Sequence, residues 1–371
     1  MNAVKNSTEC LTLLSQILLK NLGATPAGSS ADQEGVKRAY SATSRPLSES
    51  LPEFRSLAHS HHVVMRAFPA LQQIAADEND SLSADWAEEE LEQERARIGR
   101  ALACLEPICE ALARAGKVIV IKSLDHWPDL GSDLDLFTNA EPSDVVSIMK
   151  QRFEAKVAER SWGDRLANKW NFEVPGLPEL VEVHVQRLGQ TGEQLAVVDS
   201  LIHRSRPAEF VGHTFPVPAP EDRLVISTLQ RMYRHFYVRL CDIVDNAQMI
   251  ENGDVDYTDL RSLARQAGLW DGLATYMAII SDYVQLYRGR YLALPPLVTS
   301  AARFGGEQVS FKRNFIRIPL VPQAANLYAT ELTRLLLNGE ITNTLRLSLL
   351  PGLAAAAAIE LKLTGSDKGI W

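Results

Sequence analysis

The sequence predicts an α+β fold, in which a mixed α/β core lies between a helical N-terminal extension and a helical C-terminal domain. Apolar residues recur at helical spacing over residues 9–22, 52–76 and 91–112. Short β-branched runs gather between residues 117 and 186, and the pattern after residue 221 is again almost wholly helical. We place the boundaries at residues 1–85, 86–218 and 219–371.

Composition limits the classes of protein that fit. The 371 residues are 46% hydrophobic and 23% charged, an ordinary globular balance. A net charge of −8 excludes a global basic field for nucleic acid and leaves a local basic groove open. The four cysteines have no zinc-type spacing, and neither a signal peptide nor a membrane-spanning run is recognisable. We therefore expect a cytoplasmic protein with free thiols and no membrane partner, and leave its oligomeric state open.

The individual elements follow from local patterns. An acidic run after residue 76 begins with a break and then starts a long helix that continues to Leu112. Residues 24–50, rich in Ser, Ala, Gly and Pro, predict a loop. A further helix is expected over residues 142–151. Strands are expected at 117–122, 133–137, 153–157, 169–174 and 180–186, and the stretch 308–320 is left as strand or loop.

The segment GSDLDLF contains the first candidate site. In a strand, Asp133 and Asp135 point to one face, and Leu134 and Leu136 point to the other. Two adjacent carboxylates repel each other unless a cation lies between them. Hard oxygen ligands suit Mg²⁺, which shares its remaining positions with substrate phosphates, as in phosphoryl-transfer enzymes. The pair therefore predicts a magnesium site, for which Mn²⁺ is the alternative ion.

A third acid follows in the segment LVEVHVQ. Alternation places Glu182 and His184 on one strand face, opposite three valines. Glu182 is predicted to hold a second metal ion or to take the proton of the acceptor. His184 would orient Glu182 or the acceptor. The alternative is a polar strand face that meets water.

The segment VIVIKSLDHWPDLGSDLDLF resembles the active-site hairpin of the DNA polymerase β-like nucleotidyltransferase superfamily. More narrowly, the chain is similar to an uncharacterised bacterial nucleotidyltransferase family. Lys122-Ser123 matches its Lys-Gly motif, Asp133 and Asp135 match its Asp-hydrophobic-Asp motif, and Glu182-Val183-His184 matches its acid-hydrophobic-His strand. The later segments VPAPEDRLVISTLQRMYRH and RLCDIVDNAQMI are also similar, so the resemblance covers roughly residues 95–252.

The resemblance implies a nucleotidyltransferase-like sheet, two magnesium ions and a nucleoside triphosphate (NTP) substrate. Asp133, Asp135 and Glu182 would be both catalytic and metal-binding. The residues expected to bind the nucleotide are Lys122, Ser123, Gly131, Ser132, Arg234 and His235. Ser123 replaces the turn glycine of the superfamily, and Glu182 replaces the commoner aspartate. Both departures keep a non-catalytic module with the same fold open as an alternative.

Other polar groups have less specific patterns. Arg231, Arg234, His235 and Arg239 form one basic stripe on a predicted helix, either facing phosphates or facing solvent. Several remaining residues are expected to be surface, capping or ion-pairing groups: His59, His61 and His62 on a helix surface, Asp125 and Asp129 in a turn, and Asp242 and Asp245 on the same helix as the stripe.

The sequence therefore predicts a Mg²⁺-dependent enzyme that moves a nucleoside monophosphate from an NTP to a small-molecule or protein acceptor and releases pyrophosphate. A toxin-type transferase acting on tRNA, and a non-catalytic nucleotide-binding or interaction module, are the alternatives. The motifs of dinucleotide oxidoreductases, P-loop enzymes and α/β-hydrolases are missing at the positions those folds require.

Overall fold

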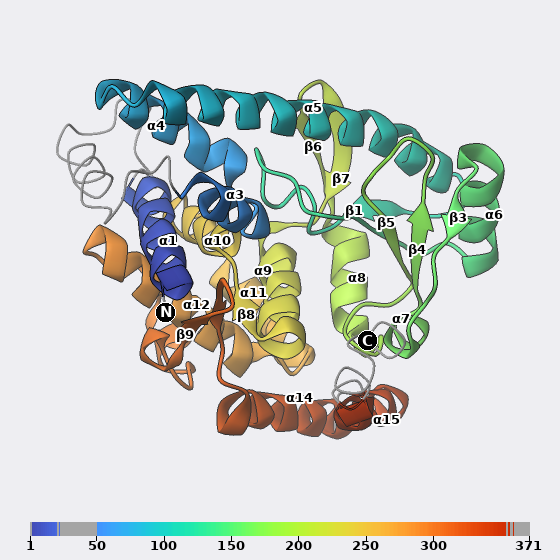
Figure 1. Ribbon diagram of the computed structural model, residues 1–371. Helices are drawn as coiled ribbons and strands as arrows, with labels where there is room; N and C mark the ends of the chain where they lie inside the picture. Colours follow the sequence, from blue (N-terminus) through green and yellow to red (C-terminus); the bar gives the residue numbers. More distant parts are fainter. Residues whose placement is uncertain (1, 21, 23–49, 354, 357–358, 360–371) are drawn as a thin grey trace.

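The computed structural model describes residues 2–20, 22, 50–353, 355–356 and 359. Within them the fold is α+β, as predicted: helices surround one mixed five-stranded sheet, and two smaller sheets lie beside it (Figure 1). The predicted loop at 24–50 lies outside the described residues except for residue 50. No helix in the described ranges is both long and apolar enough to cross a membrane.

The five-stranded sheet positions the candidate site. Its spatial order is β1-β2-β5-β4-β3; β2 and β5 are parallel, and every other pair is antiparallel. The parallel register pairs Asp135 with Glu182. The strands are β1 (Val118–Val120), β2 (Leu134–Thr138), β3 (Lys156–Val157), β4 (Lys169–Glu173) and β5 (Val181–Val185).

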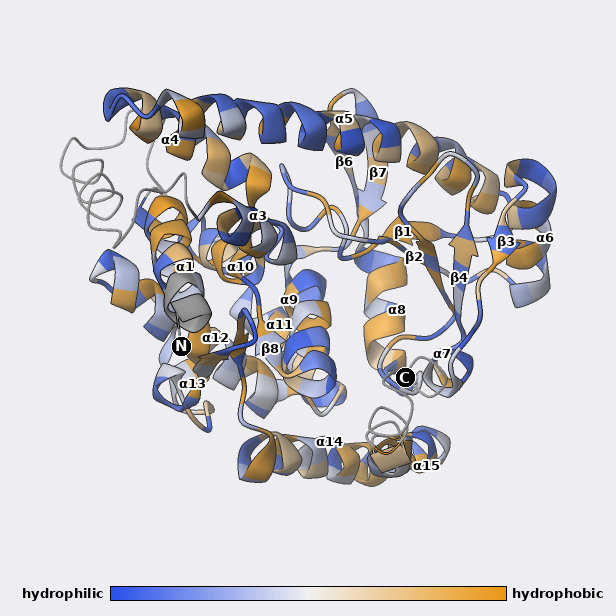
Figure 2. Cartoon of the chain, in the orientation of Figure 1, coloured by the Kyte–Doolittle hydropathy of each residue, from blue (hydrophilic) through white to orange (hydrophobic). Residues whose placement is uncertain are grey.

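One face of this sheet is apolar, as the alternation in the sequence predicts. Leu134, Leu136 and Val183 are fully buried and share a cluster with Ile98 and Leu105 of α5 (Ser81–Leu112). Figure 2 shows hydrophilic residues concentrated in the first half of α5, whereas its second half, which packs on the sheet, has more hydrophobic ones. Helix α6 (Pro142–Phe153) covers the same face. The opposite face therefore presents the acids.

The remaining strands form two small sheets. β6 (Arg206–Phe210) and β7 (His213–Val217) form a hairpin that the sequence pattern did not reveal. β8 (Tyr237–Val238), β9 (Ser310–Lys312) and β10 (Phe315–Arg317) form a three-stranded sheet, so the stretch 308–320, left open between strand and loop, contains two short strands joined by a turn.

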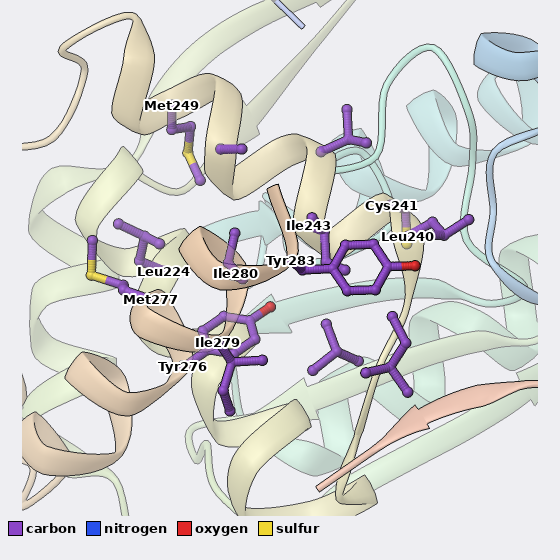
Figure 3. Close-up of a cluster of buried hydrophobic side chains, with 14 of the residues drawn as sticks. Leu224, Leu240, Cys241, Ile243, Met249, Tyr276, Met277, Ile279, Ile280 and Tyr283 are labelled. Atoms are coloured by element: carbon purple, nitrogen blue, oxygen red, sulfur yellow. The ribbon is translucent and has the colours of Figure 1, made fainter. Parts of the chain in front are cut away.

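A single apolar core joins the N-terminal and C-terminal helices. One buried cluster joins residues of the N-terminal and C-terminal helices. The N-terminal helices are α1 (Asn2–Lys20), α3 (Leu51–Ser60) and α4 (Val64–Asp77), and the C-terminal ones are α9 (Pro220–Thr228), α10 (Leu240–Glu251) and α12 (Trp270–Arg288). Figure 3 shows part of this cluster, with Ile243 of α10 near Ile280 and Tyr283 of α12. Across the cluster, the hydroxyl of Tyr283 is 2.8 Å from that of Ser15 in α1. The N-terminal helices are therefore packed against the helical body.

Two predicted helices are divided. The helix expected over 52–76 is α3 (Leu51–Ser60) and α4 (Val64–Asp77), because His62 takes a left-handed backbone conformation between them. The helix expected after residue 221 is interrupted at residues 236–239. The first helix, α1, spans Asn2–Lys20. The helical elements from residue 162 onward are α7 (Trp162–Leu166), α8 (Leu195–Arg204), α9 (Pro220–Thr228), the π-helix η2 (Leu229–His235), α10 (Leu240–Glu251), α11 (Tyr257–Gln266), α12 (Trp270–Arg288), α13 (Pro296–Thr299), η3 (Gly306–Gln308), η4 (Leu320–Ala324), α14 (Ala325–Leu337) and α15 (Ile341–Ser348).

Candidate functional site

A cavity of about 240 Å³ lies between the acid-bearing strands and the segment from η2 to Arg239. Nine of the ten predicted site residues line it: Lys122, Ser123, Gly131, Ser132, Asp133, Asp135, Glu182, Arg234 and His235. The tenth, His184, lines a smaller neighbouring cavity and contacts Glu182. The structure therefore brings the predicted residues together, from segments as far apart in sequence as β1 and η2.

The acid wall consists of Asp133, Asp135 and Glu182. Asp135 and Glu182 lie side by side on β2 and β5, and Asp133 directly precedes β2. Burial, together with the negative charges of Asp135 and Glu182, raises the pKa of Asp133 to about 6. Among the described residues, no lysine, arginine or histidine lies within ion-pair distance of Asp133. The wall therefore has excess negative charge at this carboxylate.

Lys122 is the cation closest to the acid wall. Its ammonium forms ion pairs with Asp135 and, at 3.4 Å, with Oε1 of Glu182. Nε2 of His184 lies 3.2 Å away. The neighbouring carboxylates raise the pKa of Lys122 in spite of its burial, so the side chain stays charged.

Glu182 is fully engaged by protein groups. Its Oε1 contacts Lys122 and lies 2.9 Å from Nε2 of His184, and its Oε2 accepts from Lys169 at 3.0 Å. Burial opposes ionisation of Glu182, but Lys122, His184 and Lys169 together hold its pKa well below the ordinary value. Lys169 is also paired with Asp164 at 2.8 Å. Glu182 thus organises three neighbouring side chains.

Ser123 connects the turn after β1 to the acid strand. Its hydroxyl donates to the carbonyl of Asp133 at 2.9 Å and accepts from the amide of Asp135 at 2.7 Å. The only hydroxyl proton is therefore used within the protein. This geometry gives Ser123 the task of fixing both aspartates in place, and a phosphate contact of Ser123 stays a prediction.

The basic wall faces the acids, but it is not one helical stripe. Only Arg231, Arg234 and His235 belong to η2, because the helix ends where Phe236 takes a left-handed conformation. Arg239 precedes α10, the separate helix that contains Asp242 and Asp245. The predicted single helix is therefore wrong, and the fold, not helical periodicity, brings the four basic residues to one cavity.

These basic residues differ in what they contact. Arg231 is buried and paired with Asp242 at 2.7 Å. It therefore neither faces solvent nor is free to bind a phosphate. Arg234, within the described part of the chain, makes no ion pair, although its guanidinium borders the cavity. Burial, and then the charge of Arg234, hold the pKa of His235 well below its ordinary value, so that ring is neutral near pH 7. Arg234 is therefore a cation available to a ligand, beside Arg239, whose guanidinium contacts His62 and Tyr237 and forms no ion pair among the described residues.

A buried network below the cavity was not anticipated from the sequence. Arg66 of α4 pairs with Asp129 at 2.9 Å and with Asp245 at 2.7 Å. Asp245 also contacts Nδ1 of His126 at 2.5 Å. Asp129, expected to be a solvated or capping turn residue, is 1% exposed and accepts from the amide of Met65 in the first turn of α4 at 2.7 Å. An arginine on a helix and an aspartate in a turn have no sequence signal that links them across 63 residues.

Two other expectations change with the structure. His61, expected on a helix surface, is completely buried and bonds the amide of Leu240 and the carbonyl of Asn314. Asp125 is paired with Arg223 at 2.9 Å instead of being solvated. Asp242, expected to hold Arg239 or to cap, caps α10 by accepting from the amide of Arg239, whereas its ion pair is with Arg231.

Two groups of described residues have metal-ligand geometry: Asp135, Glu182 and His184, and separately His126, Cys241 and Asp242. In the second group Asp242 is already neutralised by Arg231 and by the amide of Arg239. The first group is different, because it adjoins Asp133, whose carboxylate has no cationic partner in the described part of the chain. Its hard oxygen donors and excess negative charge fit a magnesium ion.

Comparison with protein-family models, with curated proteins and with solved structures finds no match. The functional argument therefore rests on the site itself.

Proposed function

We propose that the protein is a Mg²⁺-dependent nucleotidyltransferase, which moves a nucleoside monophosphate from an NTP to an acceptor and releases pyrophosphate. One observation carries the proposal: Asp133 and Asp135 share a cavity with Arg234, whose guanidinium has no carboxylate partner among the described residues. A metal–polyphosphate complex has the complementary charges, positive at the ion and negative along the phosphates.

The proposal includes the nucleotidyltransferase-like fold of the sheet. It is supported by the β1–β2 hairpin, with Lys122 and Ser123 after the first strand and the two aspartates at the start of the second. The parallel neighbour β5 supplies the third acid at the same level as Asp135. This arrangement agrees with the motifs on which the sequence resemblance rests.

Each side chain then has a defined task. Asp133 and Asp135 hold magnesium, which supplies charge neutralisation at the phosphates. Arg234 binds the polyphosphate and stabilises the charge that develops on the leaving pyrophosphate. Ser123 positions both aspartates through their backbone. Glu182 positions Lys122, His184 and Lys169, since both of its oxygens are already occupied.

The acceptor is a small molecule or a protein in this proposal. The net charge of −8 and the cavity volume of about 240 Å³ favour a compact acceptor over a long nucleic acid. The chemistry needs an acceptor oxygen or nitrogen in line with the departing pyrophosphate. Positioning and charge neutralisation supply most of the rate enhancement.

Pyrophosphate release tests the function. Wild type, the double variant Asp133→Asn/Asp135→Asn and the control Asp144→Asn, an exposed acid on α6, are incubated with Mg²⁺, each of the four NTPs and a cell extract as acceptor source. We expect release by wild type and control, and at least a roughly 100-fold loss in the double variant, the typical effect of removing charge stabilisation. Release that persists in the double variant contradicts the assignment. NTP binding without release by wild type indicates the non-catalytic module.

A further inference from the structure

The ammonium of Lys122 lies between the two acids that neighbouring strands pair. Asp135 of β2 and Glu182 of β5 are register partners, and Nζ of Lys122 contacts Asp135 and lies 3.4 Å from Oε1 of Glu182. Two carboxylates side by side on a sheet are the usual ligands of a shared metal ion. Here a protein cation occupies the position between them.

The charges of the acid wall point to one divalent ion. Asp133, Asp135 and Glu182 contribute three negative charges, and Lys122 contributes one positive charge. Lys169 pairs with both Glu182 and Asp164, so its positive charge is balanced by the negative charge of Asp164 and does not change the net charge of the acid wall. The remaining two negative charges match one divalent cation, whereas a second ion would leave the wall positively charged.

The donor atoms lead to the same result. Lys122, His184 and Lys169 occupy both oxygens of Glu182, and Lys122 occupies Oδ1 of Asp135. The free oxygens therefore lie on Asp133 and on the other side of Asp135. Both residues line the same cavity, so they are the acids left to bind an ion.

The backbone supports a dedicated role for this lysine. Lys122 has a φ of +61°, a left-handed conformation that is strained for a non-glycine residue. The turn is held by hydrogen bonds from the amide of Ser123 to Ile121, at 2.6 Å, and from the amide of Asp125 to Lys122, at 3.0 Å. Glycine would relieve the strain but would remove the cation. Strained residues of this kind concentrate at functional sites.

We infer that Lys122 is a built-in second cation: the centre takes one divalent ion at Asp133 and Asp135, and the ammonium of Lys122 replaces the ion that would bridge Asp135 and Glu182. The inference rests on the proposed function and corrects the two-ion expectation that the sequence resemblance implies. The inference concerns the number of bound ions, which can be counted whether or not the protein is catalytically active.

Counting bound Mn²⁺ by electron paramagnetic resonance of the free ion tests the inference. We expect one Mn²⁺ per chain for wild type, none for Asp133→Asn, and two for Lys122→Met. Lys122→Arg, which keeps the charge, should bind one. Lys117→Met, the same substitution at an exposed lysine just before β1, should also bind one.

The outcomes separate the inference from the proposed function. Two ions in wild type, or one ion in a folded Lys122→Met protein, overturn the inference and leave the transferase proposal standing. An ion that persists in Asp133→Asn lies elsewhere and also overturns it. Binding of no ion by wild type removes the metal centre and the proposed function together. If Lys122→Met does not fold, the Mn²⁺ counts for wild type, Asp133→Asn and Lys122→Arg still test the inference, which any result other than one, none and one ion overturns.

Discussion

At the scale of single residues, the site is a balance of buried charges in which each group depends on its neighbours. Arg66 is the clearest case outside the cavity. It is 13% exposed and satisfies two buried carboxylates, Asp129 and Asp245, as well as the carbonyl of His126. Removing one member of such a set leaves a charge without compensation, which costs far more than the set contributes as a whole.

Arg66→Met should therefore destabilise the protein by about 3–5 kcal/mol, since the aliphatic part of the side chain is kept and only its charge is lost. The midpoint of urea unfolding, followed by circular dichroism, measures the effect. Arg100→Met, at an exposed position of α5, is the control and should change stability by less than about 0.5 kcal/mol. Equal midpoints for wild type and Arg66→Met would mean that the network does not stabilise the fold.

At the scale of elements, local patterns predicted the strands that form the site. β1, β2, β4 and β5 are short runs with buried apolar faces, and their alternation set which side chains share a face. The β6–β7 hairpin was missed because β6 is mostly exposed and each strand contains a proline, Pro207 or Pro216. The break after His235 was missed because helical periodicity does not reveal a left-handed residue such as Phe236.

The contacts between elements explain which features of the site could not be predicted from the sequence. The acid pair and Glu182 were predicted from strand alternation alone, a local property. Their engagement by Lys122 and Lys169 depends on how β1 and β4 lie beside β2 and β5. The burial of Arg231 and Asp129 likewise depends on α10 and α4. Such contacts arise only from tertiary structure.

Helix α14 joins the rest of the molecule through a buried acid. Glu331 is 1% exposed and accepts from Nε2 of Gln194 at 2.5 Å. Burial, and then the charge of Glu193, raise the pKa of Glu331 well above its ordinary value. From about pH 4.5 up to this raised pKa the folded protein retains a proton that the unfolded chain has lost. Its contribution to stability therefore falls as the pH rises.

Glu331→Gln should weaken this pH dependence, because the amide keeps the oxygen that accepts from Gln194 and cannot ionise. Thermal unfolding at pH 5 and pH 8 measures it. We expect the variant to lose less stability than wild type between these values and to be about 1–3 kcal/mol more stable at pH 8, the usual cost of an uncompensated buried polar group. Glu209→Gln, at an exposed position of β6, should behave as wild type. Identical pH profiles for Glu331→Gln and wild type would contradict the role of Glu331.

At the scale of the whole molecule, the two walls of the cavity belong to separate bodies that a common core holds together. The sheet, with α5 and α6 on its apolar face, supplies the acids. The body of α9, η2 and α10 supplies the basic residues, and α1, α3 and α4 are packed into its core. Arg66 connects α4, the turn before β2 and α10. The distance between the walls is therefore set by packing, which suits a site that works by positioning charges.

The most direct test follows the phosphorus atoms of the nucleotide. Wild type and Asp133→Asn/Asp135→Asn are incubated with Mg²⁺, a cell extract and the NTP that gives most pyrophosphate, labelled with ³²P at either the α- or the γ-phosphorus. We predict that wild type transfers the α-label to an acceptor and releases the γ-label in pyrophosphate, and that the double variant does neither. Transfer of the γ-label to an acceptor, or transfer of the α-label by the double variant, would contradict a nucleotidyltransferase built on these two aspartates.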